Sequence, residues 1–235
     1  MITTSTSHIT NTFTNAFRLT VAAGLGVAIL FTLVEPQVTH SQVTETFTIK
    51  TSVVGESSFL VPPSDVVMTG TLNGLTGGSA TGSTQFVVQS NSVTGYTVDI
   101  SFEDNGSGNA MIGDTTGNQA IVDYEGDEAG PEPSFGLATS TSAQFAYTVL
   151  STTTSDTVQS FRASGGSCNE GAGTAVGTCW KAPDVGDFPI IARGGVATDG
   201  ATSTIVFNVT IPNNPTPVPA AEGYTATATL SLLTI

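Results

Sequence analysis

Apolar and polar residues alternate along most of this chain after residue 42. The pattern is clearest in four segments, which span residues 47–53, 96–103, 204–211 and 224–232. Because alternate side chains of a β-strand point to opposite faces, this pattern predicts strands with one buried face. Shorter stretches of the same kind predict strands at 65–72, 83–90, 119–124, 143–150 and 156–163. No long stretch has helical periodicity, so we expect an all-β fold.

The connections between these segments favour antiparallel pairing. Residues 91–95 (NSVTG) join two predicted strands and contain a glycine, which predicts a β-hairpin with a five-residue loop. The proline-rich residues 212–219 predict a stiff, extended connection before the last strand. Parallel strands need long crossover connections, and this chain offers none. We therefore predict a single antiparallel β-sandwich domain over residues 42–235.

The residues before this domain have the features of an export signal. An uncharged, apolar run at residues 19–34 follows Arg18. It is shorter than the roughly 20 residues that span a bilayer. Thr39, His40 and Ser41 form a small-x-small pattern, so we predict a signal-peptide helix within residues 1–41 and cleavage before Gln42. The alternative is that this segment stays attached as a membrane anchor.

The cysteines agree with export. Cys168 and Cys179 are the only two, and the stretch that holds them is rich in glycine, which gives a small loop the freedom to close. In an oxidising compartment two such cysteines form a disulfide. We therefore predict a bridge between them and a location outside the cytoplasm, either secreted or on the extracellular cell surface.

The charge balance limits the partners. The chain has five Lys and Arg residues against nineteen Asp and Glu residues. Such a chain repels nucleic acid and anionic lipid, which bind through clustered basic residues. We expect no nucleic-acid partner, and membrane contact only if the N-terminal segment remains uncleaved. The expected partners are other surface proteins or further copies of this chain.

The sequence lacks the usual catalytic groups. Both histidines, His8 and His40, precede the predicted cleavage site, so the mature chain has no histidine to activate a nucleophile. We therefore predict that the protein is not an enzyme. Two pairs of carboxylates are the remaining candidates for the acid–base chemistry of glycoside hydrolysis. They are Glu103 with Asp104, and Asp123 with Glu125.

Calcium is the best candidate for a bound ion, because it takes oxygen ligands from acidic, glycine-rich loops. Residues 103–109 form one candidate loop, but residues 123–128 offer more oxygen ligands, with acids at alternate positions, and are preferred. Neither matches the spacing of an EF-hand. The simpler interpretation is that these acids are solvated, and we expect no other cofactor. The preferred calcium ligands are Asp123, Glu125, Asp127 and Glu128.

Two loops are candidates for binding. Residues 125–142 contain clustered acids, prolines and glycines, and predict a long surface loop. Trp180 follows Cys179 in the second loop. It is either an exposed contact residue or a cap on the core beside the bridge.

Two segments carry a family resemblance. Residues 87–102 (VVQSNSVTGYTVDISF) and 221–235 (AEGYTATATLSLLTI) resemble segments of WxL-type and spore-coat-U-like bacterial surface domains. The resemblance implies an exported β-sandwich at the cell surface. It does not imply peptidoglycan attachment, because Trp180 has no leucine two residues later.

These observations lead to an expected function. We expect an exported, non-catalytic structural or adhesive protein of the cell surface, such as a fibre or coat subunit. The alternative is a carbohydrate- or ligand-binding surface module. Residues 44–54 (TETFTIKTSVV) predict a strong strand, which either pairs within its own sheet or completes the sheet edge of a neighbour.

Overall fold

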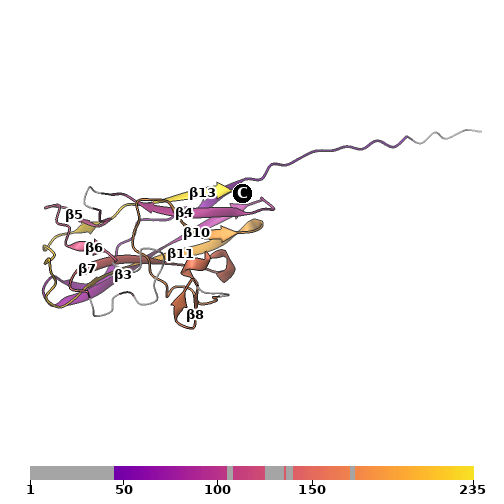
Figure 1. Ribbon diagram of the computed structural model, residues 1–235. Coiled ribbons are helices and arrows are strands. Elements are labelled where there is room, and N and C mark those ends of the chain that lie inside the picture. Colours follow the sequence, from indigo (N-terminus) through magenta and orange to yellow (C-terminus); the bar gives the residue numbers. More distant parts are fainter. Residues whose placement is uncertain (1–44, 105–107, 125–134, 136–139, 170–172) are drawn as a thin grey trace, which may run out of the picture. The chain divides into compact units, whose positions relative to one another are not determined.

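The computed structural model describes residues 45–104, 108–124, 135, 140–169 and 173–235 (Figure 1). Internal contacts divide the chain into two units, residues 1–51 and residues 52–235. In the described part of the first unit, residues 45–51 are exposed and have no regular secondary structure. The described part of the chain contains no helix that is long and apolar enough to cross a membrane. The predicted signal helix lies outside the described residues.

The larger sheet of the second unit has six strands in the order β1-β3-β11-β7-β6, and β2 pairs with the other half of β3. All of its pairs are antiparallel except β6 with β7, which is parallel. The strands are β1 (Ser57–Val61), β2 (Thr69–Asn73), β3 (Gly77–Ser90), β6 (Ile121–Asp123), β7 (Ala143–Ser151) and β11 (Ala197–Ile211).

A second sheet has three antiparallel strands in the order β10-β4-β13. They are β4 (Tyr96–Phe102), β10 (Phe188–Arg193) and β13 (Ala228–Thr234). Two small pairs complete the strands, and two 3-10 turns stand between β7 and β8. These elements are β5 (Ile112–Gly113) with β12 (Tyr224–Thr225), β8 (Ala163–Ser164) with β9 (Ser167–Cys168), η1 (Thr154–Asp156) and η2 (Gln159–Phe161). The all-β prediction is confirmed.

Both sheets contribute to one hydrophobic core. Alternate residues of β4 are buried, as the sequence pattern predicts, and they end at Phe102. The Phe102 ring lies 6.2 Å from Phe145 and 5.3 Å from Tyr147, which both belong to β7 of the larger sheet. Strand β7 is buried on both faces over most of its length, so it lies at the centre of the core.

The predicted hairpin at residues 91–95 is wrong. Strands β3 and β4 do not pair, because β3 pairs with β1, β2 and β11 while β4 pairs with β10 and β13. The loop instead connects the two sheets. It ends at Gly95, whose φ of +94° and close approach to β10 exclude a side chain. A Cβ there would lie 1.7 Å from the carbonyl oxygen of Arg193.

The strand predicted at 156–163 is also wrong. The segment holds the end of η1 and all of η2, and its strand contacts are limited to a single bridge from Thr157 to Ile191 and to Ala163, which begins β8. Val158 and Phe161 stand three residues apart and both pack on the core, which suits a 3-10 turn because residues i and i+3 share one side. Over so short a segment, the alternation of apolar and polar residues did not distinguish a β-strand from a 3-10 turn.

The strand predicted at 44–54 is not formed by residues 45–54, which make no ladder contacts. The side chains of Phe47, Ile49 and Val53 are 84%, 83% and 83% exposed. An alternating sequence specifies an apolar face, but a strand also needs a partner for its backbone groups. Within the described part of the chain these residues pair with no strand, and the Val54 carbonyl accepts a hydrogen bond from the Asn91 side chain at 3.3 Å.

Candidate functional site

The predicted disulfide is confirmed. Cys168 at the end of β9 is bridged to Cys179, which is fully buried. The bridge closes a loop of the second unit and is typical of proteins that fold in a non-reducing environment. This agrees with a location outside the cytoplasm.

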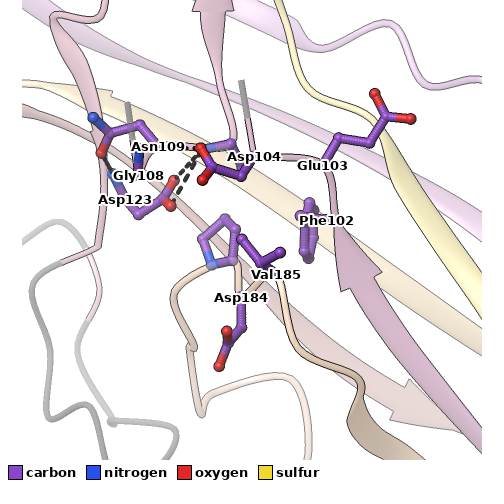
Figure 2. A pocket seen from close by; sticks show the side chains of 10 residues that line it. Phe102, Glu103, Asp104, Gly108, Asn109, Asp123, Asp184 and Val185 are labelled. Atoms are coloured by element: carbon purple, nitrogen blue, oxygen red, sulfur yellow. Dashed lines mark hydrogen bonds between the residues drawn. The ribbon is translucent and has the colours of Figure 1, made fainter. Parts of the chain in front are cut away.

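A small acidic pocket lies where three segments meet (Figure 2). The end of β4 and the turn after it form one wall, the end of β6 forms the second, and the segment before β10 forms the third. Its volume is about 110 Å³. The lining residues are Phe102, Glu103, Asp104, Gly108, Asn109, Ala110, Asp123, Pro183, Asp184 and Val185.

Hydrogen bonds from backbone N–H groups to side-chain oxygens connect the walls of the pocket. The Ala110 N–H donates to both carboxylate oxygens of Asp123, at 3.1 and 3.2 Å. The Asp123 N–H in turn donates to Asn109 Oδ1 at 3.0 Å. On the other side, the Gly108 N–H donates to Asp104 Oδ1 at 3.1 Å. The carboxylates of Asp104 and Asp123 therefore hold the backbone at Gly108 and Ala110.

The pocket changes the acidity of Asp123. Burial, together with the negative charges of Asp104 and Asp184, raises the pKa of this carboxyl to about 6, although the hydrogen bond from the Ala110 N–H lowers it. Asp123 therefore exchanges its proton close to neutral pH. A raised pKa marks candidate functional groups, but it also arises where acids hold a turn.

The geometry limits what the pocket can bind. In Figure 2 the carboxylates of Asp104 and Asp123 lie close together, whereas those of Glu103 and Asp184 point away. Accordingly, no group of three or more metal-ligating side chains is found within the described ranges. Ligand pockets usually measure about 300–1,000 Å³. The space suits a water molecule or a small ion, and it is too small for a sugar.

The pocket joins parts of the two acidic clusters that the sequence keeps separate. Asp104 and Asn109 come from the first cluster, and Asp123 comes from the preferred calcium set. The other members of that set, Glu125, Asp127 and Glu128, lie outside the described residues. A signal for the meeting of Asp104 and Asp123 is present in the sequence, because each lies at or just after the end of a predicted strand.

Trp180 is half-buried and packs against other aromatic residues. Its ring centroid lies 5.4 Å from that of Phe135, which lies 5.1 Å from that of Tyr124 in an edge-to-face contact. Phe135 was not predicted to contribute, because it stands in the irregular stretch 125–142. The three residues form an aromatic cluster next to the disulfide.

Several polar groups are buried outside the pocket, and Asp156 and Tyr147 are two of them. Asp156 is buried and forms an ion pair with Arg193, with 2.5 Å between its Oδ2 atom and the guanidinium. Tyr147 is fully buried, and its hydroxyl has no hydrogen-bond partner in the described part of the chain. Burial also raises the pKa of the Tyr147 phenol. Both groups bear on the stability of the fold.

Comparison with family models, with curated proteins and with solved structures gave no match.

Proposed function

We propose that this chain is an exported, non-catalytic structural or adhesive protein of the cell surface, a subunit of a fibre or coat. The exposed residues 45–54 carry this proposal. Four large apolar side chains in this short segment are at least 80% exposed, and they are Phe47, Ile49, Val53 and Val54. Soluble monomers rarely expose apolar groups in such concentration, and those that do use them to bind a partner.

The fold and the bridge support the same proposal. The shared core of the three-stranded and six-stranded sheets supports an antiparallel β-sandwich, an architecture that many cell-surface domains share. The disulfide supports passage through an oxidising compartment, in line with the predicted signal at residues 1–41. The resemblance to bacterial surface domains points the same way.

Surface location is tested by immunogold labelling of the producing cells. We expect an antibody against the folded domain to label intact cells, with equal labelling after permeabilisation. Labelling that appears only after permeabilisation contradicts the proposal. A matched strain without the gene gives the background.

A second candidate function rests on the aromatic cluster of Trp180, Phe135 and Tyr124. Aromatic rings beside a surface loop favour a carbohydrate- or ligand-binding module. Such a module predicts that a bound glycan changes the fluorescence of Trp180, the only tryptophan in the chain. A glycan array followed by fluorescence titration tests this, and Trp180→Ala must abolish binding without lowering the melting temperature by more than a few degrees. An array without hits contradicts the binding function, and the structural proposal is then the one that remains.

A further inference from the structure

We propose that residues 45–54 of one copy add as a β-strand to the free edge of β13 in a second copy. This rests on the proposed function as a structural subunit and names the partner as the same chain. A contact of this kind joins two different surfaces. It therefore repeats from copy to copy and builds an open fibre rather than a closed dimer.

The donor segment has the sequence of a strand and the exposure of an unpaired one. Phe47, Ile49 and Val53 alternate with polar residues, and each is more than 80% exposed. The segment also contains one acid and one base, Glu45 and Lys50, so it carries no net charge. It can therefore approach a protein of net charge −14 without electrostatic repulsion.

The acceptor edge is set by the pairing of β13. Among the described residues, β13 pairs only with β4, and β1 lies near it without pairing with it. At the two ends of this ladder, the Glu103 N–H donates to the Thr227 carbonyl and the Ile235 N–H donates to the Gly95 carbonyl. Backbone groups of an antiparallel strand alternate in direction, so those of residues 229, 231 and 233 face β4. Residues 228, 230, 232 and 234 therefore direct their N–H and C=O groups outward from the sheet.

The side chains of this edge match the donor. Leu230 and Leu232 are half-buried and pack against the core, whereas Leu233 on the opposite face is exposed. A strand added beside β13 places alternate side chains on the same face as its neighbours. The apolar series of the donor, Phe47 and Ile49 among them, then extends the core over Leu230 and Leu232.

The donor leaves the second unit next to the end of β13. Asn91 accepts the Glu56 N–H at 2.7 Å and donates through Nδ2 to the Val54 carbonyl at 3.3 Å. The neighbouring Ser92 hydroxyl donates to the Ile235 carbonyl at 2.8 Å. The donor segment 45–54 and the acceptor edge of β13 therefore start from one end of the same unit. Each copy of the chain carries both.

The experiment compares two double variants of the protein, expressed from the full-length gene and recovered from the cell surface. Phe47→Asn with Ile49→Asn changes the apolar face of the donor, and Thr46→Asn with Thr48→Asn is the control on its polar face. Both add the same side chains and no charge. The segment is exposed, so both should melt like the parent protein when dilute.

We expect the parent and the control to form filaments, seen by electron microscopy and by sedimentation. The apolar-face variant should need a concentration at least about ten-fold higher, since it loses two large buried side chains. Hydrogen exchange gives an independent readout. On assembly the hydrogen exchange of the backbone amides of residues 230, 232 and 234 should slow markedly. The amides of residues 229, 231 and 233 should exchange slowly both before and after assembly.

Two results would overturn the strand inference while leaving a surface protein in place. The first is normal assembly of the apolar-face variant, which means that another interface joins the copies. The second is slow exchange of residues 230, 232 and 234 in dilute monomers, which means that the segment pairs with its own chain. Protein that is never found at the surface instead contradicts the proposed function.

Discussion

Replacing Asp123 with asparagine should stabilise the protein at neutral pH. Burial beside Asp104 and Asp184 raises the pKa of Asp123 from 3.8 to about 6. The folded protein therefore holds this proton more tightly than the unfolded chain does. As the pH rises from about 4 through 6, the folded state must give up that proton, and the free energy of unfolding falls. Asparagine has no proton to lose, so its variant escapes this penalty.

The size of the effect follows from the pKa shift. One pKa unit corresponds to about 1.4 kcal/mol, so a shift of about two units sets a ceiling near 3 kcal/mol. Asp123 is only partly buried, and solvent screening lowers this figure to about 1–2 kcal/mol. The asparagine oxygen can still accept the hydrogen bond from the Ala110 N–H, so the turn after β4 is kept.

Urea denaturation at pH 7.5 and at pH 4.0 measures this difference. We expect Asp123→Asn to raise the free energy of unfolding by about 1–2 kcal/mol at pH 7.5, and the gain to shrink towards zero at pH 4.0. Asp65→Asn is the control, because Asp65 is exposed. An equal gain at both pH values, or no gain at pH 7.5, would refute the electrostatic reasoning.

Three further predictions concern the fold. Gly95→Ala should lower the free energy of unfolding by about 3 kcal/mol or more, because the added Cβ collides with the Arg193 carbonyl. Gly194 has open space around it, so Gly194→Ala should leave the free energy of unfolding nearly unchanged. Urea denaturation measures both variants. Replacing Cys168 and Cys179 by serine should cost about 2–3 kcal/mol, seen as a lower melting temperature, and a change within error would contradict it. Tyr147→Phe should add about 1 kcal/mol in urea, because it removes a buried hydroxyl without a partner, and a loss of stability would show that this hydroxyl is bonded.

The sequence predicts strands well where alternation and one buried face coincide. Strands β4 and β7 fall within one residue of their predicted bounds, whereas the strand predicted at 224–232 is divided into β12 and β13. Strand β10 was not predicted, because Ile190 and Ile191 are adjacent and both buried, which breaks the alternation. A bulge between Pro189 and Ile191 makes this possible, and Pro189 is tolerated because β10 is an edge strand.

Pairing and sites are predicted less well, because they depend on contacts between distant segments. The loop at residues 91–95 has the length of a hairpin, but its sequence does not reveal that the two strands belong to different sheets. Similarly, Asp104 and Asp123 belong to separate clusters in the sequence and meet only when β4 and β6 end at the same place. Cys168 and Cys179 were predicted, since two cysteines allow only one bridge.

The most direct test of the account is the intact mass and assembly state of the protein recovered from producing cells. Mass spectrometry combined with size-exclusion chromatography and light scattering measures both on one sample. We predict a chain that begins near Gln42, retains residues 45–54 and elutes as large assemblies. A cleaved chain that stays monomeric at all concentrations, or a chain that keeps residues 1–41, would contradict it.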